Sequence, residues 1–133
     1  LLAFGSMLTP ALEAAEELDA TLANMRFVKP IDRDLIVELA RDHSLLISIE
    51  ENTLIGGAGS EVARVLDEIV SPVQFVRMGL PDTFIVHADQ ALLLAQVGLD
   101  KDGIIHAARA NQGSTPISEQ PSGTAQVSEQ ELR

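Results

Sequence analysis

A short apolar run followed by two carboxylates and a glycine-rich turn is the feature of this sequence that most restricts its fold. Residues 45–49, Leu-Leu-Ile-Ser-Ile, are typical of a buried parallel strand. Apolar residues at helical spacing predict a helix from about residue 62 to residue 69. In open α/β sheets, ligands and partners bind at the carboxyl ends of the strands. The candidate site therefore consists of the polar residues and the turn between strand and helix: Glu50, Glu51, Asn52, Gly56, Gly57, Gly59 and Ser60.

Strands and helices alternate along the rest of the chain. Further strands are predicted at residues 1–6, 20–27 and 73–76. Helices are predicted from Pro10 to Leu18 with Thr9 as N-cap, after Asp32, from about Asp89 to Val97 before Gly98, and from Asp100 to about Ala110. Residues 79–82 are expected to form a turn. This alternation predicts an α/β fold in which a mainly parallel sheet lies inside a three-layer α/β/α sandwich.

Composition divides the chain into a domain and a tail. The domain is expected to cover residues 1–111. Residues 112–133 are rich in Gly, Ser, Thr, Pro, Gln and Glu and carry little apolar surface, so we predict a disordered tail. Because the first residues already resemble a core strand, we also expect the chain to be a piece of a longer protein.

The charge of the chain restricts its partners. Asp and Glu number 20 against 9 Lys and Arg, which gives a formal net charge of -11. Such a surface repels nucleic acid and anionic membranes, and no apolar run reaches the roughly 18 residues of a membrane span. The chain has no cysteine, which excludes disulfides, thiolate metal sites and a cysteine nucleophile. The absence of cysteine is consistent with a cytoplasmic protein.

Glu50 and Glu51 are candidates for an acid/base pair, because neighbouring carboxylates can raise one another's pKa. Successive side chains of a strand point to opposite faces, however, so the two groups are not expected to share a proton. We expect one of them to form a local cap or salt bridge and the other to face a partner surface.

The glycine turn partly imitates the dinucleotide-binding pattern G-x-G-x-x-G. Val62 stands where that pattern has its third glycine, and carboxylates stand where a pyrophosphate would approach. The glycines are therefore interpreted as allowing a tight turn and the close approach of another backbone.

The remaining ionisable residues do not form a recognisable site. His43, His87 and His106 lie in different elements, and no pair has metal-binding spacing. His87 stands near the carboxyl end of the sheet and is kept as a candidate. Arg26 and Lys29 could attract a phosphate, but we expect them to pair with the many carboxylates.

Four motifs carry a resemblance to a known family. They are MRFVKPID at residues 25–32, EEN at 50–52, GGAGSEV at 56–62 and GLPDTFIVH at 79–87. From about Leu1 to Ala110 the sequence resembles the C-terminal domain of the 1-deoxy-D-xylulose-5-phosphate synthases, which are transketolase-like, thiamine-diphosphate-dependent enzymes. The resemblance implies a transketolase C-terminal-domain-like sheet that lacks its first edge strand. It also implies that the second strand lies at one edge, followed by the first, third and fourth.

The resemblance also implies where the chemistry lies. The family decarboxylates pyruvate on thiamine diphosphate and transfers the two-carbon unit to glyceraldehyde 3-phosphate, for isoprenoid, thiamine and pyridoxal synthesis. Its Mg²⁺ and diphosphate are held by a Gly-Asp-Gly motif followed by Asn, which this chain lacks. We therefore expect no catalytic, cofactor-binding or metal-binding residue here. The implied role is a scaffold that contacts upstream domains of the same enzyme and helps build a homodimer.

Two other interpretations remain open. One is a stand-alone flavodoxin-like module that binds a ligand or a protein through the glycine turn. The other is the C-terminal domain of a 2-oxoacid dehydrogenase β subunit. The sequences KPID and GLPD favour the synthase over the second of these.

Overall fold

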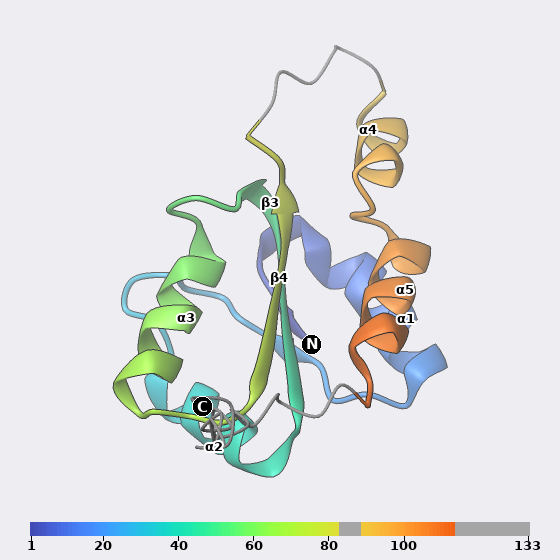
Figure 1. Cartoon of the computed structure of the whole chain (residues 1–133). Coiled ribbons are helices and arrows are strands. Elements are labelled where there is room, and N and C mark those ends of the chain that lie inside the picture. The colour runs from blue at the N-terminus through green and yellow to red at the C-terminus, as the bar shows by residue number, and fades with distance from the viewer. Residues whose placement is uncertain (83–88, 114–133) are drawn as a thin grey trace, which may run out of the picture.

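The protein consists of a four-stranded parallel sheet between two layers of helices (Figure 1). The structure is a computed structural model that describes residues 1–82 and 89–113. The strands are β1 (Leu2–Ala3), β2 (Ala23–Asn24), β3 (Leu45–Thr53) and β4 (Gln74–Leu80). The helices are the 3₁₀ helix η1 (Gly5–Met7) and the α-helices α1 (Leu8–Leu18), α2 (Arg33–Asp42), α3 (Ala58–Glu68), α4 (Gln90–Gln96) and α5 (Lys101–Asn111).

The strand order is β2-β1-β3-β4, as the resemblance implied. All three strand pairings are parallel, and Leu2 of β1 lies between Ala23 of β2 and Ser48 of β3. Helices α2 and α3 cover one face of the sheet, and α1 and α5 cover the other (Figure 1). The predicted three-layer α/β/α sandwich is confirmed.

Side chains of β3 alternate between the two halves of the core. Leu46 packs with the α2 and α3 residues, whereas Ile47 and Ile49 pack with those of α1 and α5. This alternation follows from the pleat of a strand, in which successive side chains point to opposite faces. Since β3 is covered on both faces, residues 46–50 are all buried.

Several predicted boundaries are wrong. Strand β3 continues to Thr53 and β4 to Leu80, so the predicted turn at residues 79–82 begins inside a strand. These two strands pair along most of their length. The hydrogen bonds between them hold additional residues in strand conformation. Strands β1 and β2 contain only two residues each, because the chain turns into η1 directly after β1.

The predicted helix starts are correct where an aspartate caps the helix. Asp32, Asp89 and Asp100 each accept a hydrogen bond from a backbone N–H in the first turn. The prediction for Thr9 is wrong, because η1 leads directly into α1 at Leu8. Most of the predicted tail lies outside the described residues.

We predict that the two-sided core can be tested with one pair of substitutions. Ile104 of α5 is fully buried against the sheet, so Ile104→Ala should lower the free energy of unfolding by about 2–5 kcal/mol. Ile55→Ala is the matched control, since Ile55 is 74% exposed and its truncation should change the free energy by about 0.5 kcal/mol or less. Urea unfolding measures both, and equal losses would contradict the described packing of α5.

Candidate functional site

Glu50 lies inside the protein and caps α3 from a distance in the sequence. Its side chain is only 2% exposed, on the α2 and α3 face of β3. Its Oε2 accepts a hydrogen bond of 2.6 Å from the Gly59 N–H, and the Ala58 N–H also contributes. The first N–H groups of a helix have no partner inside the helix and form its positive end. The Glu50 carboxylate thus fills the position that a phosphate takes in nucleotide-binding turns.

Burial has the largest effect on the pKa of the Glu50 carboxyl group. Loss of water raises the pKa of Glu50 above its ordinary value, although the two N–H groups and the positive charge of Arg77 act in the opposite direction. Glu50 Oε1 and the Ser48 hydroxyl, two residues earlier on β3, are buried without a hydrogen-bond partner in the described protein. The protein therefore keeps an incompletely paired polar cluster beneath α3.

The glycine turn fits tightly over this cluster. A Cβ on Gly57 would lie 1.7 Å from Glu50 Oε1 and 2.5 Å from the Thr53 carbonyl oxygen. A Cβ on Gly59 would lie 2.7 Å from the Ser48 hydroxyl. Gly56 has open space around it but takes a φ of +74°, which favours glycine. The turn thus requires glycine for two reasons, a positive φ at one position and close approach at the other two.

Glu51 points to the opposite face of β3 and forms a different contact. Its carboxylate accepts hydrogen bonds from the Ser6 hydroxyl and from Gln90 Nε2, the second at 2.6 Å. These two hydrogen bonds lower the pKa of Glu51. Glu51 therefore connects η1 and the start of α4 to the end of the central strand, while Asn52 is exposed beside it.

The structure changes the description of the other predicted site residues. Residues 50–52 belong to β3 rather than to a loop after it, and Gly59 and Ser60 lie in the first turn of α3. The Ser60 hydroxyl donates to the Leu54 carbonyl oxygen at 3.3 Å. His87 lies outside the described residues.

A hollow of about 420 Å³ lies beside Glu51 at the carboxyl ends of β1, β2 and β3. Its lining residues are Phe4, Gly5, Ser6, Met25, Arg26, Val28, Glu51, Asn52 and Ala58. The expectation that Arg26 and Lys29 pair with carboxylates is wrong within the described residues, whose ion pairs involve other cations. Both residues stand in an exposed loop between β2 and α2.

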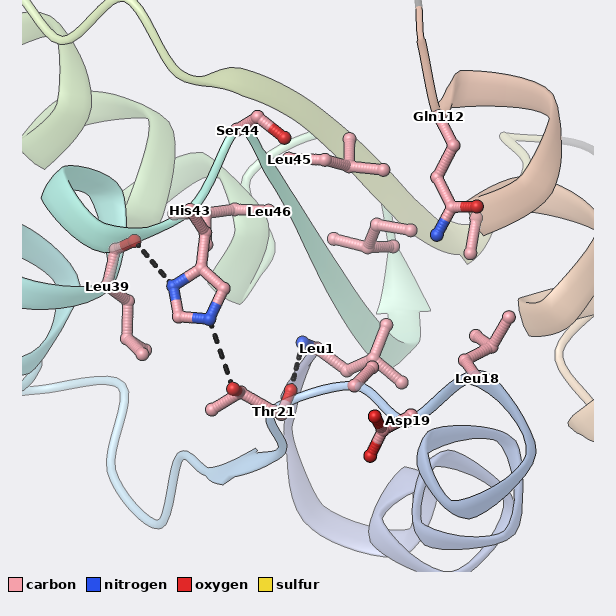
Figure 2. A pocket seen from close by; sticks show the side chains of 13 residues that line it. Leu1, Leu18, Asp19, Thr21, Leu39, His43, Ser44, Leu45, Leu46 and Gln112 are labelled. Carbon is pink, nitrogen blue, oxygen red and sulfur yellow. Dashed lines mark hydrogen bonds between the residues drawn. The ribbon is translucent and has the colours of Figure 1, made fainter.

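A second hollow, of about 250 Å³, lies at the amino ends of the strands (Figure 2). His43 borders it, and both of its ring nitrogens are used inside the fold. Nδ1 lies 3.0 Å from the Leu39 carbonyl oxygen, so it carries a proton, and Nε2 lies 3.0 Å from the Thr21 hydroxyl (Figure 2). His43 therefore joins the end of α2 to the segment before β2, which is a structural role.

Sequence reasoning missed two members of the cluster, Ser48 and Arg77. Arg77 lies on β4 opposite Ser48, its side-chain carbons pass within 3.2 Å of the position of a Gly59 Cβ, and its guanidinium donates to Ser60 at 3.3 Å. A serine inside an otherwise apolar strand was the available signal for Ser48. In the part of the chain that the structure describes, no three His, Asp or Glu side chains could together hold a metal ion.

Comparison with known proteins gives consistent matches. Residues 1–104 match the family model described as the transketolase C-terminal domain. A 1-deoxy-D-xylulose-5-phosphate synthase of Dechloromonas aromatica is 64% identical over 110 residues, which is 83% of this chain and 18% of the relative. The synthase of Aromatoleum aromaticum is 63% identical over 109 residues, which is 82% of this chain and 18% of the relative.

A solved structure has the same fold. It is described as a split-gene transketolase, an inactive β4 tetramer, and superimposes with a TM-score of 0.76 at 38% sequence identity. The match covers 82% of this chain and 37% of the other. The chain thus spans less than a fifth of the length of the curated relatives quoted above.

We predict that Glu50 makes folding depend on pH in a specific direction. A carboxyl group whose pKa is raised in the folded state contributes stability that is complete below its unfolded pKa and is lost as the pH rises through the folded pKa. The free energy of unfolding of the wild type, relative to Glu50→Gln, should therefore fall as the pH rises above 4.5, the ordinary pKa of this carboxyl group. Urea unfolding at several pH values measures the difference, and parallel pH profiles would contradict the assignment.

We also predict that Ser48 and Gly59 are energetically coupled. Gly59→Ala places a methyl group against the Ser48 hydroxyl and should cost about 1–3 kcal/mol. In a Ser48→Ala background the clashing, unpaired hydroxyl is gone, so the same change should cost less, with a coupling of at least about 0.5 kcal/mol. Ser44→Ala is the control background, because Ser44 is exposed and lies just before the start of β3. Additive costs in both backgrounds would refute the close approach.

Proposed function

This chain belongs to the family of transketolase C-terminal domains, and we propose that it is the C-terminal domain of a 1-deoxy-D-xylulose-5-phosphate synthase. The observation that carries the proposal is the 64% identity to a protein of that name across 83% of this chain. The parent enzyme would convert pyruvate and glyceraldehyde 3-phosphate into 1-deoxy-D-xylulose 5-phosphate and CO₂, the start of isoprenoid and thiamine synthesis. It would act as a homodimer in the cytoplasm, with thiamine diphosphate and Mg²⁺ as cofactors.

The described residues do not fit these cofactors. A diphosphate requires N–H groups or cations that are available, and the N–H groups at the start of α3 already bind Glu50. A Mg²⁺ ion requires oxygen ligands that converge, and the described side chains offer no such group of three. We therefore assign the cofactors and the chemistry to upstream domains of the parent and expect the isolated chain to be inactive.

The role proposed for this domain is that of a scaffold. The contacts that support it are internal: Glu50 fixes the start of α3, and Glu51 connects η1, β3 and α4. Of the predicted site residues, Glu50 and Gly59 are buried in this internal contact. The others, Glu51, Asn52, Gly56, Gly57, Ser60 and His87, remain candidates for contact with upstream domains or with a second subunit. We place the end of the domain at Asn111, where α5 ends, and interpret residues 112–133 as a tail.

The two alternative functions are less well supported. A module that binds a nucleotide through the glycine turn would need the space that Glu50 fills. For a 2-oxoacid dehydrogenase β subunit, relatives at 51–64% identity would be expected to carry that name. The eight relatives compared at this level are described as 1-deoxy-D-xylulose-5-phosphate synthases. Among the helices in residues 1–82 and 89–113, none combines the length and the hydropathy of a membrane-spanning segment.

We predict that this domain can replace its counterpart in a relative. Residues 1–110 should substitute for the matching part of the Dechloromonas aromatica protein, and the chimera should keep synthase activity to within about tenfold, since roughly 1.4 kcal/mol of imperfect docking corresponds to that factor. The same protein without a C-terminal domain is the control and should lose activity. Formation of 1-deoxy-D-xylulose 5-phosphate from pyruvate and glyceraldehyde 3-phosphate measures both.

Two outcomes would contradict the proposal. A well-folded, correctly assembled chimera without synthase activity would show that this domain is not a synthase domain. Binding of thiamine diphosphate and Mg²⁺ by the isolated chain in a calorimetric titration would show that the chemistry is not confined to the upstream domains.

A further inference from the structure

The loop after β2 exposes apolar side chains without an evident reason inside the domain. Its five residues, Arg26 to Pro30, are all exposed, and we call them the carboxyl-edge loop. Phe27 is 68% exposed and Val28 is 38% exposed. A single exposed apolar residue is ordinary on a protein surface, but two adjacent ones next to a hollow form a patch that a partner can cover.

The same loop carries cations that have no ion-pair partner among the described residues. The ion pairs of this part of the chain involve Arg33, Arg41, Arg64, Lys101 and Arg109. Arg26 and Lys29 flank Phe27 and Val28, in a chain whose formal net charge is -11. An apolar centre with positive charge on both sides is complementary to a surface that is apolar at its centre and acidic around it.

The hollow at the carboxyl ends of the strands continues this patch. Arg26 and Val28 form part of one wall, and Asn52 and Ala58 form part of another. Its volume of about 420 Å³ is large enough for side chains of a partner. The loop and the hollow together are therefore one surface with apolar, cationic and amide groups. Its one carboxylate, that of Glu51, already accepts hydrogen bonds from Ser6 and Gln90.

We propose that the carboxyl-edge loop and its hollow bind an acidic, apolar surface of the upstream domains of the same polypeptide. This inference rests on the proposed function. The chain spans 18% of the relatives' length, so in a parent of that length most of the polypeptide would lie outside this domain and be covalently attached to it. Covalent attachment gives the upstream surface a high effective concentration at the loop.

A second copy of this domain fits the loop less well. A two-fold contact between two such loops would bring Arg26 and Lys29 close to the same cations of the other copy. Like charges at an interface disfavour association. The upstream domains are therefore the occupant to which we commit.

A photocrosslinking experiment in the full-length parent identifies the occupant. p-Benzoylphenylalanine is placed at position 27, and at position 70 as the control, because Val70 is 85% exposed but lies in the loop before β4 at the opposite end of the sheet. After irradiation, mass spectrometry should map crosslinks from position 27 to upstream residues of the same polypeptide. Position 70 should give few or none. Crosslinks from position 27 to the C-terminal domain of another copy, or none at all, would overturn the proposal.

Substitutions measure the strength of docking. In the full-length parent, Phe27→Ser should speed the proteolytic release of the C-terminal domain on the order of tenfold to a hundredfold, the factor expected when a buried aromatic side chain is lost. Val70→Ser, the control, should leave the rate unchanged. Arg26→Glu should also speed release, and more so at low salt than at high salt. Equal release rates for all variants would overturn the proposal.

The outcomes separate this inference from the proposed function. If the parent has synthase activity but position 27 crosslinks elsewhere, the proposed function stands and the proposed docking surface is refuted. If the parent has no synthase activity but position 27 crosslinks to upstream residues, the proposed function is refuted and the proposed docking surface stands.

Discussion

The hydrogen bond between the Glu50 carboxylate and the first N–H groups of α3 determines the geometry of the carboxyl end of the sheet. It fixes where α3 begins, and the turn before α3 must then pass close above the carboxylate, where only glycine fits at Gly57. Arg77 and Ser60 extend the same contact network toward β4. An internal anion at a helix N-terminus also neutralises the site that would attract a phosphate.

In this arrangement the N–H groups of Ala58 and Gly59 bind Glu50, so the turn before α3 does not offer them to a phosphate. The strand, glycine turn and helix are retained, while the N–H groups are used inside the protein. What remains for function is the outer surface at the same end of the sheet, where Glu51 positions η1 and α4 and where the carboxyl-edge loop is exposed. A scaffold that contacts other domains is the role that fits both features.

Sequence reasoning succeeded where the determinant is local and failed where it is not. The pleat of a strand alone places Glu50 and Glu51 on opposite faces, and aspartates before apolar runs mark three helix starts correctly. Burial of Glu50 depends instead on a contact across nine residues with Gly59, which local propensity does not encode. The lengths of β3 and β4 depend on their mutual pairing, and the shortness of β1 depends on the turn into η1. Arg26 and Lys29 have no ion-pair partner among the described residues because of where the fold places their loop, and local sequence does not encode that position.

The most direct measurement is a titration of the ¹⁵N-labelled chain with pyrophosphate, followed by NMR at the amides of Ala58 and Gly59. Because Glu50 already binds these N–H groups, their resonances should not shift at millimolar pyrophosphate. In Glu50→Ala the same amides are released, and they should shift on titration. A saturable shift in the wild type would contradict the account, because it would show that the start of α3 is a ligand site and not an internal contact.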